Sequence, residues 1–170
     1  VPGALRIIET VSARYDGDAL VGAGTVLDAE TARHCILSGA QFVVSPALDL
    51  GLIACCRTYG IAVIAGALTP TEVLQAWKGG ADFVKVFPAN AVGGAGYIKS
   101  LKAPLPQIEL VPTGGVSLKN AADFIAAGAS ALGVGSDLVD TRALRDGQAS
   151  LITQRARQFV EAVKQAREAK

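Results

Sequence analysis

The chain repeats a strand-like run followed by a helix-like segment, with strand starts roughly twenty residues apart. Strands and helices that alternate in this way are typical of parallel strands joined by right-handed crossovers. The predicted strands occupy residues 19–26, 41–46, 61–66, 83–87, 108–112 and 131–134. The predicted helices occupy residues 2–14, 28–38, 48–58, 69–78, 97–101, 117–127 and 150–170, with Ser117 as the N-cap of the sixth. Six such units belong either to a doubly wound sheet or to part of a (β/α)8 barrel.

The carboxyl ends of the predicted strands favour the barrel. Each strand ends at a small or polar residue, as a ring of active-site loops requires: Thr25, Ser45, Gly66, Pro88, Thr113 and Gly135. The final two units both end in glycine turns, the position where barrels commonly bind phosphate. We therefore predict the α/β class and a (β/α)8 TIM barrel, with six βα units in this chain.

Composition narrows the function classes. At 170 residues the chain fits one domain with an ample core. Its 16 basic and 15 acidic residues give a formal charge of +1, which does not suggest a nucleic-acid partner. No apolar run is long enough to cross a membrane, and no signal peptide opens the chain.

The cysteines and the single histidine predict neither a disulfide framework nor a metal site. Cys35, Cys55 and Cys56 fall on predicted helices without a CxxC motif, which fits reduced thiols and predicts a cytoplasmic protein. His34 is expected on a solvated helix face. The chain has no methionine and begins at Val1, which indicates loss of an N-terminal piece or an engineered start.

Lys85 stands in the middle of an apolar strand, residues 83–87. A strand in a parallel sheet is expected to be buried on both faces. Burial disfavours the charged ammonium, and a partly neutral lysine is a nucleophile that forms a Schiff base with a carbonyl substrate. The alternative is a lysine that pairs with a buried carboxylate or extends to the end of its strand.

Glycines follow the last two predicted strands, in the motifs TGGV at 113–116 and GVGS at 133–136. Glycines at a strand-to-helix turn let the backbone approach a ligand and direct N–H groups toward an anion. The two turns predict a phosphate site, with ordinary turn chemistry as the alternative. Thr25 and Ser45 are candidates to hydrogen-bond a carboxylate or hydroxyl, or else simply end their strands.

Five motifs resemble, in order and spacing, those of the KDPG/KHG class I aldolases: VGAGTVL at 21–27, FVVSP at 42–46, FVKVFPA at 83–89, PTGGV at 112–116 and GVGSDL at 133–138. The resemblance implies a commonly trimeric (β/α)8 barrel that needs no cofactor, with the six strands as its third to eighth. It implies cleavage of 2-keto-3-deoxy-6-phosphogluconate to pyruvate and glyceraldehyde 3-phosphate, a reaction of the Entner–Doudoroff pathway.

The resemblance also implies residue roles. Lys85 matches the Schiff-base lysine, and Phe87 packs beside it. Thr25 and Pro46 match residues that line the pyruvate pocket. The remaining substrate-binding residues, most of them in the phosphate cradle, are Thr113, Gly114, Gly115, Gly135 and Ser136.

The chain departs from the family pattern at its start. The family's general base, a glutamate, and a nearby arginine belong just before Val1, and Glu9 is no substitute. We therefore expect one N-terminally incomplete barrel domain over residues 1–170, and slow catalysis, since losing a general base costs roughly 10²–10⁴-fold. Ala47 replaces a usual glycine, and the segment 64–66 lacks a frequent proline; both are expected to tune the pocket.

Other functions stay open from the sequence. The substrate is alternatively the galactonate epimer or 4-hydroxy-2-oxoglutarate. An inactive phosphate-binding barrel fragment explains the glycine turns without catalysis. A phosphosugar epimerase or a thiamine-phosphate-synthase relative shares those turns, but neither has a reason to bury a lysine on the sixth strand.

Overall fold

The structure is a computed structural model that describes residues 2–169. Its five strands lie in one sheet in the order of the sequence, β1-β2-β3-β4-β5, and helices alternate with them. This arrangement confirms the predicted α/β class. The chain forms two compact units, Val1–Lys85 and Val86–Lys170.

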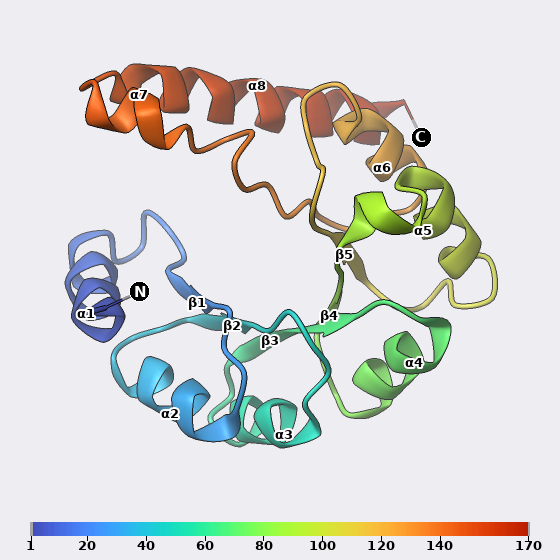
Figure 1. The fold of residues 1–170 in the computed structure, drawn as a ribbon. Helices are drawn as coiled ribbons and strands as arrows, with labels where there is room; N and C mark the ends of the chain where they lie inside the picture. Colours follow the sequence, from blue (N-terminus) through green and yellow to red (C-terminus); the bar gives the residue numbers. More distant parts are fainter. Residues whose placement is uncertain (1, 170) are drawn as a thin grey trace. The chain divides into compact units, whose positions relative to one another are not determined.

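The first unit contains three parallel strands that pair in register (Figure 1). Ala23 of β1 lies opposite Val43 of β2, which lies opposite Val63 of β3. Figure 1 shows α2, α3 and α4 along one side of these strands. The elements are α1 (Ala4–Arg14), β1 (Gly22–Gly24), α2 (Ala29–Leu37), β2 (Phe42–Val44), α3 (Leu50–Thr58), β3 (Ala62–Ala67), α4 (Pro70–Lys78) and all of β4 (Phe83–Val86) except its last residue, Val86.

Three helices of this unit begin at polar caps. The carboxylates of Asp28 and Asp49 accept hydrogen bonds from backbone N–H groups three residues ahead, at 2.6 and 2.5 Å. Thr69 and Glu72 form a capping box at the start of α4. The N–H donors of Thr31 hold the pKa of Asp28 below its usual value, and those of Thr69 do the same for Glu72. The caps confirm the predicted starts of α2 and α4.

The core of the first unit lies between β2–β3 and α3. Val43, Val63, Leu52 and Ile53 have no exposed surface. Leu52 and Ile53 are consecutive on α3, so their burial together shows that this helix turns a broad apolar face inward. The buried residues of β2 and β3 and the apolar face of α3 therefore form one apolar layer.

The second unit is mainly helical. Its elements are η1 (Ala89–Val92), α5 (Ala95–Lys102), β5 (Leu110–Pro112), α6 (Ala121–Ala126), α7 (Thr141–Arg145) and α8 (Ala149–Glu168). The long helix α8 packs along α6 and α7, and Figure 1 shows it in red beside both. Phe124 and Ile125 of α6 and Phe159 of α8 are buried.

Two sequence predictions for this unit are wrong in detail. Ser117 is not the N-cap of a helix that reaches residue 127, because α6 begins only at Ala121. Residues 117–120 instead form a turn in which the Asn120 side chain accepts a hydrogen bond from the Ser117 N–H, at 2.8 Å. The strand predicted at 131–134 is reduced to one parallel bridge, Thr113 to Gly133.

Within residues 2–169, no helix is both long and apolar enough to span a membrane. No group of three or more His, Cys, Asp or Glu side chains there is arranged to hold a metal ion. Cys35, Cys55 and Cys56 are free thiols, and His34 is exposed, as predicted.

Candidate active site

Lys85 lies on β4, where burial alternates along the strand. Val84 and Val86 are buried, whereas Phe83 and Lys85 are half-buried. Phe87 just beyond the strand is 38% exposed. The prediction of burial on both faces is therefore wrong, because only the valine face is closed. Partial burial is still enough to lower the pKa of the Lys85 ammonium below its ordinary 10.5, since the charged form loses hydration.

Asp82 fixes the start of β4 beside β3. Its carboxylate accepts a hydrogen bond from the Val63 N–H at 2.8 Å, and its own N–H donates to the Val63 carbonyl at 3.0 Å. Asp82 thus binds both the backbone N–H and the backbone carbonyl of Val63. This double link determines where the strand that bears Lys85 begins.

Because its pKa is lowered, Lys85 should become reactive toward acetylation at a lower pH than an ordinary lysine. The neutral amine is the nucleophile, and its fraction increases as pH rises through the pKa. We expect the acetylation rate of Lys85, followed by peptide mass spectrometry, to reach its half-maximum below pH 10.5. Exposed Lys78 in the same sample is the internal reference. A half-maximum at or above 10.5 contradicts the predicted desolvation.

Thr25 follows β1 in a conformation that is uncommon for its residue type. Its φ is 58°, the only positive value at a non-glycine residue among those described. A β-branched residue in the left-handed region is strained, and such strain is concentrated at functional sites. Thr25 is exposed and lines a cavity of about 540 Å³ between β1, α1 and α2.

Pro46 follows β2 and is held by close backbone contact with Gly66. A Cβ on Gly66 would overlap the Pro46 carbonyl group, so only glycine fits there. The Gly66 N–H donates to the Ala47 carbonyl at 3.2 Å. Ser45, 1% exposed, accepts a hydrogen bond from the Ala47 N–H at 3.3 Å. This bond favours the interpretation of Ser45 as a residue that ends its strand.

The second unit brings six predicted residues together. One cavity of about 410 Å³, here called the glycine-turn cavity, is lined by both glycine motifs. Its lining includes every substrate-binding residue predicted beyond position 86: Phe87, Thr113, Gly114, Gly115, Gly135 and Ser136. The two turns, about twenty residues apart in the sequence, are neighbours because the Gly133 N–H donates to the Pro112 carbonyl at 2.9 Å.

The first glycine turn needs its glycines. Gly114 and Gly115 have φ values of 92° and 72°, in the left-handed region. A Cβ on Gly115 would lie 2.5 Å from the Asn90 Cβ. The Asn90 N–H donates to the Gly114 carbonyl at 3.3 Å, which holds the turn against η1.

Some backbone donors of the two glycine turns are left unpaired by the residues that the structure describes. No acceptor among residues 2–169 pairs with the N–H groups of Gly114, Gly115, Gly135 or Ser136. Unpaired N–H groups gathered around one cavity are the arrangement that binds a phosphate or another anion. This geometry supports the predicted phosphate cradle.

Sequence reasoning missed Ser117 and Asp137, which also line the glycine-turn cavity. Asp137 accepts a hydrogen bond from the Leu118 N–H at 3.3 Å and forms an ion pair with Arg155 of α8 at 3.2 Å. The only sequence signal was the position of Asp137 directly after GVGS. Nothing local in the sequence indicates its contact with α8.

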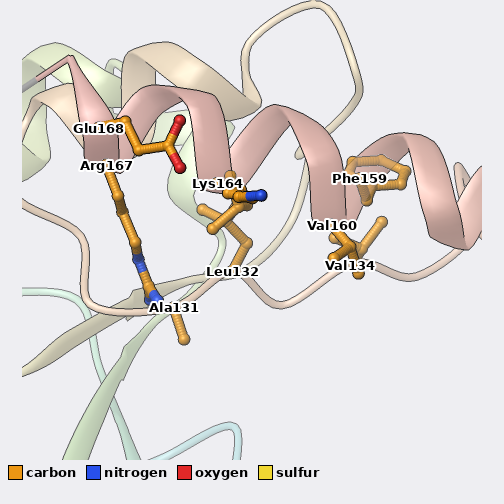
Figure 2. Close-up of a pocket in the computed structure, with 9 residues that line it drawn as sticks. Ala131, Leu132, Val134, Phe159, Val160, Lys164, Arg167 and Glu168 are labelled. Carbon is orange, nitrogen blue, oxygen red and sulfur yellow. The ribbon is translucent and has the colours of Figure 1, made fainter.

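A second cavity of the same unit has a different character. It measures about 670 Å³ and lies between α8 and the segment 131–134 (Figure 2). Leu132, Val134 and Val160 face it, with Lys164 and Arg167 along one side. The Arg167 guanidinium donates to the Ser130 carbonyl at 2.7 Å, which ties α8 to this segment. The largely apolar lining does not suit a phosphate, so the glycine-turn cavity is the better anion site.

Known proteins are similar to this chain over most of its length. The family model for KDPG and KHG aldolases matches residues 1–155. The 2-dehydro-3-deoxy-phosphogluconate aldolase of Treponema pallidum is 36% identical over 146 residues, which cover 86% of this chain and 70% of that protein. The 2-dehydro-3-deoxy-6-phosphogalactonate aldolase of Escherichia coli is 40% identical over 154 residues, covering 89% and 72%.

Among solved structures, the KDPG aldolase of Legionella pneumophila, with pyruvate captured as a covalent carbinolamine, superposes with a TM-score of 0.83. The match covers 90% of this chain and 74% of that one at 30% identity. It supports the predicted (β/α) barrel architecture. With a family model that spans most of its length, the chain belongs to the KDPG and KHG aldolase family.

Proposed function

We propose that this protein is a class I aldolase that cleaves 2-keto-3-deoxy-6-phosphogluconate to pyruvate and glyceraldehyde 3-phosphate, with Lys85 as the Schiff-base residue. The observation on which the proposal depends is the desolvated amine on β4, whose pKa is lowered by burial. The Legionella relative supports it, because pyruvate was captured there as a carbinolamine.

The proposed chemistry begins when the neutral amine of Lys85 attacks the C2 ketone of the substrate. The carbinolamine loses water to form an iminium ion. As a base removes the C4 hydroxyl proton, the C3–C4 bond breaks, its electron pair moves into the iminium, and the aldehyde leaves. The resulting enamine takes a proton at C3, and water releases pyruvate from Lys85. No residue of this chain is assigned the role of that base.

The other residues are proposed to position the substrate. Thr25 and Pro46 would contact the pyruvate portion, and Phe87 would limit water near the amine. The phosphate would lie in the glycine-turn cavity, where unpaired N–H groups of the two turns are available as donors. The proposal requires that this cavity bind the phosphate of the substrate.

Two other substrates of the same class remain alternatives. The E. coli relative acts on the galactonate epimer, and 4-hydroxy-2-oxoglutarate lacks the phosphate. We further propose one barrel domain that assembles as a homotrimer and works in the cytoplasm, in the Entner–Doudoroff pathway. Sedimentation of the purified protein tests the assembly state.

The proposed reaction is tested by offering the three substrates separately and following pyruvate with lactate dehydrogenase and NADH. We expect pyruvate from the phosphorylated gluconate derivative, and less from the unphosphorylated acid, because only the former can use the phosphate cradle. Pyruvate from none of the three, in a folded sample, would favour a phosphate-binding protein without lyase activity.

A further inference from the structure

Asp137 places a carboxylate in the lining of a cavity proposed to hold a phosphate dianion. Two like-charged groups in one cavity repel each other, and the repulsion is strongest where little water separates them. An unneutralised Asp137 would therefore weaken phosphate binding. The structure shows how the charge is offset, because Arg155 lies 3.2 Å from one carboxylate oxygen.

The two partners of Asp137 have separable roles. The bond from the Leu118 N–H links Asp137 to the segment just beyond the first glycine turn, at 3.3 Å. The bond from Arg155 connects it to α8. A neutral amide oxygen can accept the first bond equally well, whereas only a carboxylate makes the second an ion pair.

Because the Arg155–Asp137 ion pair is exposed, breaking it should change phosphate binding more than it changes folding stability. The side chains of Arg155 and Asp137 are 48% and 30% exposed. Ion pairs this exposed contribute little to folding stability. Arg155 itself is not among the residues that line the glycine-turn cavity. Any influence it has on phosphate would therefore act through the charge of Asp137.

We propose that Arg155 on α8 is a positioning residue that raises the phosphate affinity of the glycine-turn cavity by neutralising Asp137. The inference rests on the proposed function, since it needs a phosphate in that cavity. It also explains why an acidic residue is tolerated there. The ion pair offsets the charge of a carboxylate that also links the second glycine turn to the segment just beyond the first.

The test is titration of the full chain with inorganic phosphate by calorimetry. We expect Arg155→Ala to weaken phosphate binding about tenfold at low salt, because it exposes the Asp137 charge. Asp137→Asn should bind phosphate at least as tightly as the parent. The double variant should resemble Asp137→Asn, since the charge that Arg155 offsets is gone. Arg157→Ala, an exposed arginine on the same helix, is the matched control and should bind like the parent.

Kinetics separate this role from a structural one. Arg155→Ala should raise the KM for the phosphorylated substrate and leave the KM for 4-hydroxy-2-oxoglutarate unchanged. The difference should shrink at about 1 M salt, where the screening length falls to about 3 Å. Equal losses for both substrates, or weak phosphate binding by Asp137→Asn, would overturn the inference. A parent that traps pyruvate at Lys85 yet binds no phosphate would overturn it too, while leaving the lyase proposal intact.

Discussion

Lys85→Ala should abolish covalent capture of pyruvate by borohydride and lower aldol cleavage by about 10⁴-fold or more. Enzymes accelerate reactions by about 10⁶-fold or more, and here most of that gain is assigned to one covalent intermediate. Without the amine there is no iminium to accept the electrons of the breaking bond. Mass spectrometry of borohydride-treated protein, with and without pyruvate, measures the capture directly.

Two further variants make the result specific. Lys85→Met keeps a long unbranched side chain on β4, so it separates loss of the amine from loss of packing. Lys78→Ala removes an exposed lysine of α4 and should label like the parent. Pyruvate-dependent labelling that survives in Lys85→Met would show that another amine forms the adduct, and the proposed mechanism would be wrong.

Gly115→Ala should weaken binding of the phosphorylated substrate about tenfold to a hundredfold. The new methyl group would lie 2.5 Å from the Asn90 Cβ and would force a left-handed residue to change conformation. The turn must then move, and its N–H groups leave the cavity. Each hydrogen bond to a charged group contributes about 1.5–3 kcal/mol, which is the basis of the expected loss. The KM for the phosphorylated substrate is the measurement.

Gly128→Ala is the matched control for this substitution. Gly128 also has a positive φ, 105°, and lies in the same unit after α6, but it does not line the glycine-turn cavity. Both variants should lose stability in urea unfolding, because both strain a left-handed residue. Only Gly115→Ala should raise the KM. Equal effects of the two on KM would indicate that stability, and not the cradle, determines phosphate binding.

Much of the fold follows from local patterns. The caps at Asp28 and Thr69 were predictable because a side-chain oxygen three residues before a backbone donor is a local arrangement. Lys85 was predictable as a strand residue because valine and phenylalanine flank it. The errors occur where local signals compete. Ser117 resembles an N-cap, yet Asn120 binds its N–H and delays the helix to Ala121.

The segment 131–134 shows the limit of strand prediction. Its residues favour a strand, but pairing depends on what lies beside it, and the structure has one bridge at Gly133. The half-exposed face of β4 has the same cause. Apolar residues around Lys85 indicate a buried strand, but they do not indicate how completely other segments cover each face. How deeply a strand is buried depends on the segments that pack against it, and the strand's own sequence does not specify them.

By itself the sequence determined the βα repeat, the placement of Lys85 in a strand, and the two glycine turns, because each depends on residues close together in the chain. Only the tertiary structure decided that both turns line one cavity. It also decided that Asp137, Leu118 and Arg155, which are far apart in the sequence, meet at its edge. Contacts of this kind depend on how separate segments pack, which a local sequence pattern does not predict.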